Sequence, residues 1–383
     1  MPDPEVIDSD GHILEPKCLW DDYLEPQYRG GIRWVEDNEG LEYLEIAGVR
    51  SRVSPGALGG VGGYPAPNGD RTAHFNRRKM RYLDGAPPGS MDPHERIAVL
   101  DQEGIDIALI YPTIGLIWEE HVADRGLAAA LCRAYNDWLF DFCRPYPRRL
   151  VPVAHVALIG VEEAVAEMRR AAKLGAKAFY LRPDLVNGRT VAHPDFDPIW
   201  ATAQDLDLPV APHVVVRTET GPVRSWTDSL TSGPQTGLIF GFTYLILPVQ
   251  AAFTAMLTAG VFERFSRLKY VILESGGGWI AHWLDRLKSK YKVGKGFSML
   301  KHEPEYYFRR QCFISVEPDE KTTPFMAQLL GADRFVWASD FPHIDAELGV
   351  VRELKANIAS LSPADQAKIL GANARAIYSL GPR

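Results

Sequence analysis

Cysteine is scarce in this sequence. The four cysteines, Cys18, Cys132, Cys143 and Cys312, are far apart, and no C-x-x-C pair occurs among 383 residues. This excludes a small disulfide-stabilised scaffold and a paired-cysteine metal or redox motif. We therefore expect reduced, mostly buried thiols in a cytoplasmic protein.

The sequence also lacks an excess of basic residues. It has 42 Lys and Arg against 49 Asp and Glu, which gives a formal net charge of −7. Nucleic-acid binding usually needs a clustered basic face, so we expect no nucleic-acid partner. Residues 1–10 have neither a basic segment nor an apolar run, and no signal peptide is predicted.

Charged side chains are missing from residues 229–262. Within this stretch, residues 238–260 are long enough to cross a bilayer. However, they include Thr243, Pro248 and Gln250, and the stretch lies between two strand-like segments. We expect no transmembrane span but a buried helix that lines a pocket or the interface of a homodimer.

Short apolar segments alternate with helical patterns along most of the chain. The predicted strands are residues 5–11, 105–111, 150–156, 176–182, 208–214, 270–275, 311–316 and 334–339. Helical patterns follow them at residues 92–103, 121–143, 161–174, 194–205, 277–290, 318–330, 346–360 and 362–380. Near-continuous apolar runs such as KYVILES are typical of parallel strands with both faces covered. The pattern predicts an α/β fold, a (β/α)8 TIM barrel. A doubly wound open sheet is the alternative, but no G-x-G-x-x-G follows the first strand.

One insertion interrupts the repeat after the first strand. Residues 32–50 alternate apolar and polar side chains around a DNEG turn, which predicts a β-hairpin. Residues 51–88 are rich in Gly and Pro, and a loop of this length in a compact domain is usually functional. We predict a single catalytic domain over residues 1–383, with residues 20–90 as a cap over the mouth of the barrel.

Side chains suited to metal binding occur at four predicted strand ends. They are found in IDSDGH on the first strand, APH on the fifth, VILES on the sixth and ASDFPH on the eighth. Active sites of TIM barrels lie at this end of the strands. We predict that one or two divalent cations are bound by Asp10, His12, His213, Glu274 and Asp340.

The donor types indicate the metal and the catalytic groups. Three carboxylates and two imidazoles favour Fe or Mn, and Zn is also compatible with them. We predict Asp340 and Glu274 as the groups that transfer protons. Glycines 276–278 after Glu274 are expected to let backbone approach a ligand closely. Strand alternation predicts that Asp8, Asp10 and His12 share one face, with Asp8 one layer deeper as a supporting group.

Other side chains near strand ends are candidates for holding the substrate. Arginine forks bind carboxylates, and an aromatic set including Trp118, Phe240, Phe242, Tyr244 and Phe253 suggests an apolar pocket. The predicted substrate-binding residues are Arg182, Arg217, Arg224, His155, Trp226 and His343. Glu317 is predicted to support the site from the seventh strand end.

Taken in this order along the chain, the four motifs resemble the amidohydrolase superfamily, in the branch of aminocarboxymuconate-semialdehyde decarboxylase (amidohydrolase family 2). The resemblance implies a metal-dependent barrel enzyme. The chain departs from that family's pattern in two places, because Asp10 replaces the first histidine of the usual H-x-H and Glu274 replaces a sixth-strand histidine. The fourth strand also does not end in lysine, so a bridging carbamylated lysine is not expected.

These observations leave several functions open. The resemblance favours hydrolysis or non-oxidative decarboxylation of a partly apolar organic acid. The carboxylate-rich donors also allow an oxygenase that depends on one or two irons on the same scaffold. A barrel without catalysis is the third alternative, and it predicts that the protein holds no stoichiometric metal.

Overall fold

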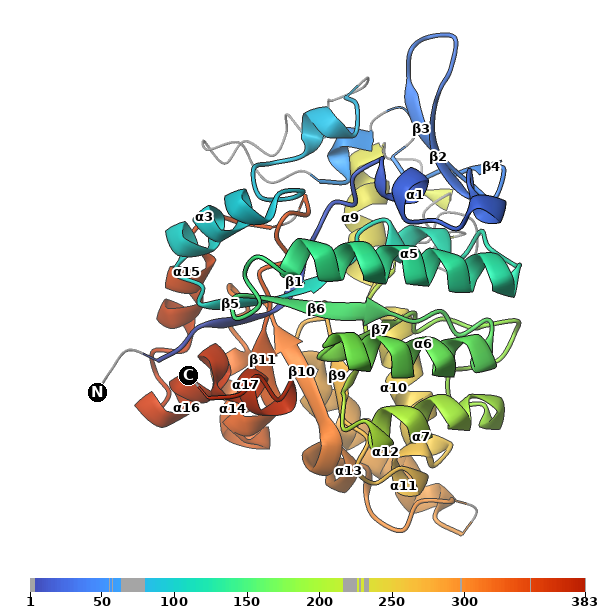
Figure 1. Ribbon diagram of the computed structural model, residues 1–383. Coiled ribbons are helices and arrows are strands. Elements are labelled where there is room, and N and C mark those ends of the chain that lie inside the picture. The colour runs from blue at the N-terminus through green and yellow to red at the C-terminus, as the bar shows by residue number, and fades with distance from the viewer. Residues whose placement is uncertain are drawn as a thin grey trace.

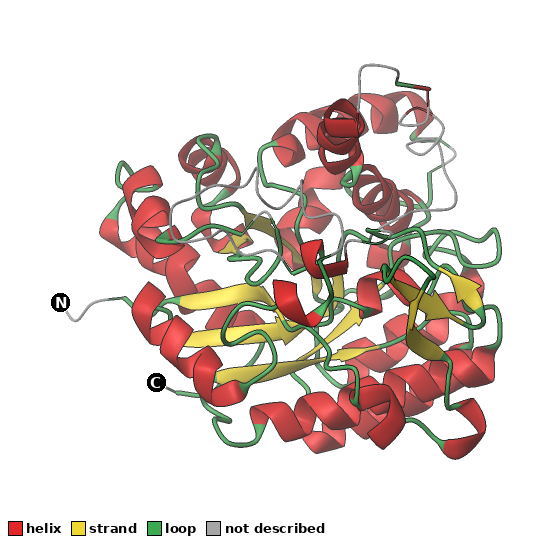
Figure 2. Ribbon diagram, turned by 90° about the horizontal axis from the view of Figure 1, so that it is seen from above, coloured by secondary structure: helices red, strands yellow, loops and turns green. Residues whose placement is uncertain are grey.

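Eight parallel strands form the centre of the molecule (Figures 1 and 2). The computed structural model describes residues 4–54, 56, 58–62, 80–215, 226, 229–230, 234–296, 298–344 and 346–382. In sheet order the strands are β1 (Ile7–His12), β5 (Ile107–Tyr111), β6 (Leu150–His155), β7 (Ala178–Leu181), β8 (Val210–Pro212), β9 (Tyr270–Ile272), β10 (Cys312–Val316) and β11 (Phe335–Trp337). This order follows the sequence, so each connection leads to the neighbouring strand.

The two edges of the sheet meet. Asp340 N donates to the Asp10 carbonyl at 3.1 Å, and His12 N donates to the Phe341 carbonyl at 2.7 Å. These bonds join the segment after β11 to β1 and close the sheet into a barrel. The predicted (β/α)8 architecture is confirmed.

Helices surround the barrel (Figure 2). Between strands they are α3 (Pro93–Glu103), α4 (Gly115–Trp118), α5 (Arg125–Cys143), α6 (Val161–Leu174), α7 (Asp197–Asp205), α9 (Pro234–Tyr244), α10 (Leu247–Thr258), α11 (Val261–Arg264), α12 (Trp279–Gly294), α13 (Pro304–Gln311) and α14 (Thr323–Leu330). After β11 come α15 (Val350–Asn357), α16 (Pro363–Ala367), a π-helical turn (Lys368–Ala372) and α17 (Asn373–Ile377). The predicted helix over residues 121–143 begins later, because the Asp124 side chain accepts from Leu127 N and caps α5 there.

Apolar side chains pack in two layers. Inside the barrel, Ile7, Leu109, Val153, Tyr180 and Val271 belong to one buried cluster. A second cluster fills the space between the strands and the surrounding helices. Burial on both faces explains why the strands are near-continuous apolar runs in the sequence.

A β-bulge in β1 decides which way the site residues point. Asp8 is opposite Ala108, whereas Gly11 is opposite Ile110, so β1 has one residue more than β5 over this interval. The extra residue reverses the alternation. His12 pairs with Tyr111 of the inner cluster, whereas Asp8 pairs with Ala108 of the outer one. The expectation that Asp8 shares a face with Asp10 and His12 is therefore wrong.

The insertion after β1 forms a small antiparallel sheet. It consists of β2 (Ile32–Glu36), β3 (Glu42–Ile46) and β4 (Val49–Arg50). The predicted hairpin is confirmed, with Ile32 opposite Ile46, and β4 adds a short third strand. Further along the insertion, Gly62 forms an antiparallel bridge with His343. Residues 63–79 of the Gly- and Pro-rich segment lie outside the described residues.

The uncharged stretch forms α9 and α10, which differ in burial. In α10, Val249, Phe253 and Met256 are fully buried, as expected. In α9, Ile239 is 69% exposed and Phe242 is 41% exposed, so the expectation of a buried helix is wrong there. The segment Ile239–Thr258 has a mean hydropathy of 1.6 and the length of a membrane span, but 28% of it is buried and the helix is interrupted after Tyr244. Core helices of soluble proteins share this length and composition.

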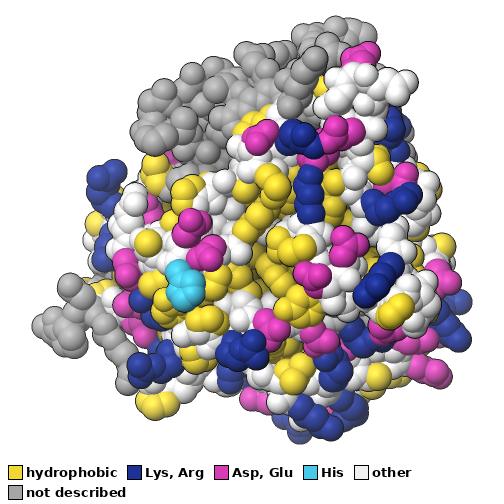
Figure 3. All heavy atoms as spheres, turned by 45° about the horizontal axis from the view of Figure 1, so that its top comes forward, with side chains coloured by type: hydrophobic (Ala, Val, Ile, Leu, Met, Phe, Trp, Pro, Cys, Tyr) yellow, Lys and Arg dark blue, Asp and Glu magenta, His cyan; other side chains and the backbone are white. Residues whose placement is uncertain are grey.

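Charges of both signs are mixed on the surface. Among the described side chains on the face in Figure 3, Lys and Arg are interspersed with Asp and Glu and do not gather into one area.

The bulge predicts a sharp response to substitution of Gly11. A Cβ at Gly11 would lie 2.8 Å from Asp8 Oδ2 and 3.3 Å from the Leu109 carbonyl oxygen. Asp8 cannot easily move, because Ser339 holds its carboxylate. We expect Gly11→Ala to lower the free energy of unfolding by about 1–3 kcal/mol, measured by urea denaturation.

Gly294 provides the matched control. It ends α12, and a Cβ there would meet no atom within 4 Å. We expect Gly294→Ala to leave stability unchanged or raise it slightly. Equal unfolding midpoints for the two variants would contradict the packing described for the bulge.

Candidate active site

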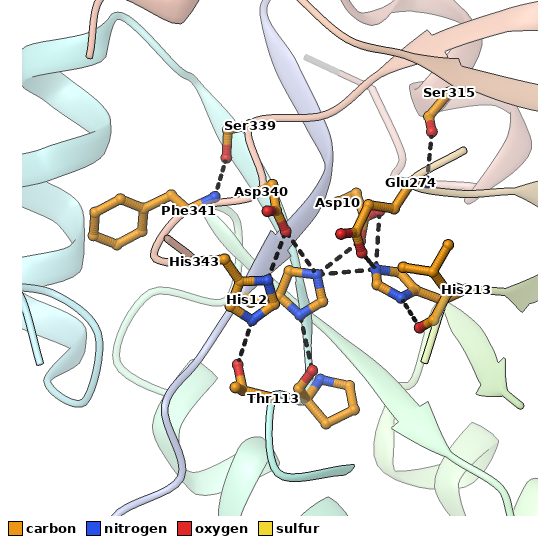
Figure 4. Close-up of polar contacts among 12 residues, drawn as sticks. Asp10, His12, Thr113, His213, Glu274, Ser315, Ser339, Asp340, Phe341 and His343 are labelled. Atoms are coloured by element: carbon orange, nitrogen blue, oxygen red, sulfur yellow. Dashed lines mark hydrogen bonds and ion pairs between the residues drawn. The ribbon is translucent and has the colours of Figure 1, made fainter. Parts of the chain in front are cut away.

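The five predicted ligands converge at the open end of the barrel (Figure 4). His12 Nε2 lies 3.0 Å from His213 Nε2, 3.4 Å from Asp10 Oδ1 and 3.4 Å from Asp340 Oδ1. His213 Nε2 lies 3.3 Å from Asp10 Oδ2 and 3.0 Å from Glu274 Oε2. Side chains from the ends of four strands therefore converge on the two facing histidine nitrogens.

Hydrogen bonds fix the tautomers of both histidines. His12 Nδ1 is 2.8 Å from the Pro112 carbonyl, and His213 Nδ1 is 2.7 Å from the Val214 carbonyl. Since a carbonyl only accepts, each Nδ1 must carry the proton. When both rings are neutral, the two Nε2 atoms carry lone pairs that face each other at 3.0 Å. A proton or a cation between them would remove the resulting repulsion.

A cation at this position would also stabilise the Asp10 carboxylate. This carboxylate is fully buried, and the described residues offer its oxygens no donor in hydrogen-bond geometry; His213 Nε2 and His12 Nε2 lie at 3.3 and 3.4 Å. Burial raises its pKa, but His213 and His12 outweigh this and hold the pKa of Asp10 at about 2. Burial lowers the pKa of His213, yet Asp10 and Glu274 hold it well above its usual value. An ionised carboxylate without a donor fits a metal cation.

Glu274 and Asp340 adopt a backbone conformation that is uncommon for non-glycine residues. Their φ angles are 43° and 54°. Each follows a short strand, and the turn brings its carboxylate to the barrel mouth (Figure 4). Strain of this kind costs about 1–3 kcal/mol per residue and is concentrated at functional sites.

Asp340 is oriented by a chain of hydrogen bonds. His343 Nδ1 is 2.8 Å from Asp340 Oδ1, and His343 Nε2 is 2.8 Å from Thr113 Oγ1. Burial, followed by His12, holds the pKa of His343 well below its usual value, so the ring is neutral. Both of its nitrogens are occupied by protein groups, and this makes His343 a support for Asp340 rather than a ligand.

Asp8 and Arg96 tie β1 to the segment after β11. Asp8 accepts from Ser339 N at 3.0 Å and from Ser339 Oγ at 2.6 Å. Arg96 donates to the carbonyls of His12 at 2.7 Å and Phe341 at 3.4 Å. Both side chains thus fix the backbone on either side of the site, which agrees with the supporting role predicted for Asp8.

A cavity of about 380 Å³ leads to the site. Glu274 and Asp340 form part of its wall, so these carboxylates face both the cation position and the cavity. The other wall is apolar, with Phe242, Leu245 and Ile246 from the α9–α10 region. The predicted supporting residue Glu317 also lines this cavity.

The glycines after Glu274 have a different role from the one expected. Gly277 N donates to Glu320 at 2.8 Å, and Gly278 N donates to the same carboxylate. A Cβ at Gly277 would lie 2.7 Å from Val316, and one at Gly278 would lie 2.5 Å from Thr322. These two glycines let protein segments pack closely and bond to Glu320, whereas Gly276 lines the cavity.

The family model described as Amidohydrolase matches residues 7–380. The chain belongs to the amidohydrolase family. A curated relative, 2-amino-3-carboxymuconate-6-semialdehyde decarboxylase of Dictyostelium discoideum, is 24% identical over 298 residues, which cover 76% of this chain and 77% of the relative.

Solved structures share the fold along the whole length. An amidohydrolase from Mycobacterium avium subsp. paratuberculosis superposes with a TM-score of 0.81 at 23% identity, covering 100% of this chain and 99% of that one. A 5-carboxyvanillate decarboxylase from Novosphingobium aromaticivorans, with bound manganese and 3-methoxy-4-hydroxy-5-nitrobenzoic acid, gives 0.70 at 21% identity, covering 98% and 97%.

This amidohydrolase is therefore a metal-dependent enzyme, of the hydrolase or carboxy-lyase type that the family includes. The donors described above fit that assignment. Asp10, His12 and His213 lie close enough for one atom of each to ligate the same ion. Asp340 lies beside His12 in a second, overlapping group, in which His343 orients its carboxylate.

The amidohydrolase places several predicted substrate residues away from the cation position. Arg182 pairs with Asp184 at 2.7 Å, approaches Glu120 at 3.6 Å and lines a separate cavity of about 250 Å³. His155 Nε2 is 2.8 Å from Glu119. Trp226 is 62% exposed and stacks on Phe240, so it does not reach the site. Arg217 and Arg224 lie outside the described residues.

Sequence analysis missed Thr113, Ser339 and Arg96. Thr113 follows β5 in a turn and contacts the site only through His343. Arg96 lies in an amphipathic helix, where an arginine normally faces solvent, yet it is fully buried. Only Ser339 carried a usable signal, because it immediately precedes Asp340 at a strand end.

The bulge separates the roles of two aspartates that look alike in the sequence. We expect Asp10→Asn to weaken Mn²⁺ binding at least about 100-fold. Loss of a residue that only orients a metal ligand already lowers metal affinity about 10–100-fold. Isothermal titration of protein stripped with a chelator measures this.

Asp8→Asn is the control. The Asp8 side chain pairs with the outer face of the barrel and holds the backbone of Ser339 rather than the cation position. We expect Asp8→Asn to weaken Mn²⁺ binding by about tenfold or less, well below the loss in Asp10→Asn. Equal losses in both variants would mean that Asp10 does not bind the cation.

Proposed function

We propose that this amidohydrolase is a non-oxidative decarboxylase of an aromatic or similarly unsaturated carboxylic acid. The observation that carries the proposal is the convergence of Asp10, His12, His213 and Asp340 beside a cavity walled by Glu274. The decarboxylase activities named for the Dictyostelium and Novosphingobium proteins support this choice over hydrolysis.

We assign Asp10, His12, His213 and Asp340 to the cation, with Mn²⁺ the preferred ion for this oxygen-rich set. A bound divalent cation supplies Lewis acidity at the carboxylate and a neighbouring oxygen of the substrate. The apolar wall formed by Phe242, Leu245 and Ile246 would hold the unsaturated part of the substrate. The extent of the cavity suits a molecule with a single ring.

Glu274 is the proposed proton donor. Its side chain lies 3.0 Å from His213 and faces the cavity, where it can reach the carbon that loses its carboxylate. In the reaction the bond between that carbon and the carboxylate breaks, and its electron pair stays on the substrate carbon. Glu274 delivers a proton to this carbon, CO2 leaves, and solvent returns the proton to Glu274.

An iron-dependent oxygenase is the second candidate. The observation that favours it is the group of three carboxylates, Asp10, Glu274 and Asp340, around the two metal-facing histidines. His343 argues against a second iron, because both of its nitrogens already have protein partners. Elemental analysis separates the candidates: two irons with oxygen consumption select the oxygenase, one manganese or zinc with CO2 release selects the decarboxylase, and no stoichiometric metal indicates a non-catalytic barrel.

We further propose that the protein is cytoplasmic and forms a homodimer. We also propose that residues 20–90 act as a lid over the site. All four cysteines are free, as suits a reducing compartment. The bridge between Gly62 and His343 brings the insertion to the site, which supports the lid. The exposed apolar side chains of Ile239, Phe242 and Leu247 support an interface along α9 and the start of α10.

The assignment of Glu274 predicts a loss of turnover without a loss of metal. We expect Glu274→Gln to lower kcat about 10²–10⁴-fold, the range for a group that transfers a proton. CO2 release from a panel of hydroxylated benzoic and enoic acids measures kcat, and titration measures Mn²⁺ binding.

Two variants calibrate this experiment. Asp340→Asn should lower both metal affinity and turnover, whereas Glu305→Gln on the surface of α13 should change neither. Retained CO2 release in Glu274→Gln would remove this residue from the mechanism. Hydrolysis of esters or amides without any CO2 release would reject decarboxylation.

The proposed interface predicts a change of mass in solution. We expect Ile239→Lys to convert a dimer into a monomer in analytical ultracentrifugation, because it would bury an unpaired charge. Phe325→Lys is the control, since Phe325 is 67% exposed but belongs to α14. A wild-type protein that sediments as a monomer would reject the homodimer.

A further inference from the structure

Glu15 is a buried carboxylate outside the cation cluster. It follows β1 by three residues and is fully inaccessible to solvent. Both of its oxygens accept from backbone N–H groups: Ile114 N donates to Oε2 at 2.8 Å, Gly115 N donates to Oε1 at 3.1 Å, and Thr113 N approaches both oxygens at 3.2 and 3.3 Å. Its carboxylate thus holds the turn that leads from β5 into α4.

The same turn contacts two histidines of the site (Figure 4). The Pro112 carbonyl accepts from His12 Nδ1 at 2.8 Å, which leaves the His12 Nε2 lone pair for a cation. The Thr113 hydroxyl is 2.8 Å from Nε2 of the neutral His343 ring, whose Nδ1 donates to Asp340. Two of the four proposed ligands therefore depend on the placement of residues 112 and 113.

Close packing gives the turn little freedom. A Cβ at Gly115 would lie 2.5 Å from Pro112 Cβ and 2.9 Å from His155 Nδ1. Tyr82 Oη donates to the backbone carbonyl of Glu15 at 3.1 Å and fixes the acid from the other side. Movement of the Glu15 carboxylate would therefore be transmitted to the turn rather than absorbed by loose neighbours.

A carboxylate at this place is costly for the fold. Burial raises the pKa of Glu15 to about 7, although the N–H groups of Ile114 and its neighbours oppose this. A buried ionisable group destabilises a protein unless its partners compensate. Here the backbone N–H groups of the turn compensate for burial of the Glu15 carboxylate, so Glu15 and the turn stabilise each other in one conformation.

We propose that Glu15 is a positioning residue for the cation site. It fixes residues 112–115, and through Pro112 and Thr113 it sets the orientation and tautomer of His12 and the orientation of Asp340. This inference rests on the cation site of the proposed function and is independent of the reaction that the site performs.

The experiment measures metal binding rather than turnover. Glu15→Gln keeps the shape of the side chain but turns an NH2 group towards a backbone donor. We expect it to weaken Mn²⁺ and Co²⁺ binding about 10–100-fold, as for loss of a partner that orients a ligand. The visible absorption spectrum of the Co²⁺ protein should also change, because the arrangement of ligands changes.

Glu42→Gln is the matched structural control. Glu42 is also a buried carboxylate, and it accepts from Tyr82 N at 2.7 Å and pairs with Lys17, but none of its described contacts is with the 112–115 turn. We expect it to lower the Tm while metal affinity and the Co²⁺ spectrum stay as in wild type. Thr113→Val should weaken binding, and Thr113→Ser, which keeps the hydroxyl, should restore it.

The outcomes are distinguishable. If wild-type protein binds neither ion, the proposed function fails before Glu15 is tested. If wild type binds but Glu15→Gln has the same affinity and spectrum, Glu15 is only structural and this inference is overturned. If Glu15→Gln does not fold, Glu15→Asp replaces it, because aspartate is shorter by one methylene and withdraws the carboxylate from the turn. Wild-type metal affinity in both Glu15→Asp and Thr113→Val would likewise overturn the inference.

Discussion

Two imidazole nitrogens, His12 Nε2 and His213 Nε2, face each other across 3.0 Å at the mouth of this barrel, and the site is organised around that contact. It exists because the opposite nitrogens of His12 and His213 are both committed to backbone carbonyls. The carboxylate of Asp10, buried without a donor, adds negative charge at the same point. In the absence of a cation, this concentration of unsatisfied groups costs free energy that the surrounding barrel has to offset.

The barrel supplies that stability through its closure. The hydrogen bonds that join β1 to the segment after β11 involve the backbone of Asp10, His12 and Asp340 themselves. Arg96 and Asp8 strengthen the same seam from outside the barrel. The seam that completes the fold is therefore also the place where three of the proposed ligands are presented, and Asp340 at this seam has a positive φ angle.

Much of this could be predicted from the sequence, because strand ends are readable. Near-continuous apolar runs located the strands, and ligand-type residues at or just after the strand ends pointed to Asp10, His12, His213, Glu274 and Asp340. The predicted face of Asp8 was wrong, since a bulge leaves no mark in a six-residue strand. It also failed for Glu15 and Thr113, whose role depends on hydrogen bonds between segments about 100 residues apart. The exposure of α9 could not be foreseen, because composition alone does not distinguish an apolar helix in the core from one on the surface.

The bulge in β1 implies that the chemistry of this site can change without any substitution. A regular strand with the same residues would turn His12 and Asp8 towards the same side. If the bulge were lost while His12 kept its place, the Asp8 carboxylate would turn into the barrel. The donors around the cation position would then differ although every residue is the same.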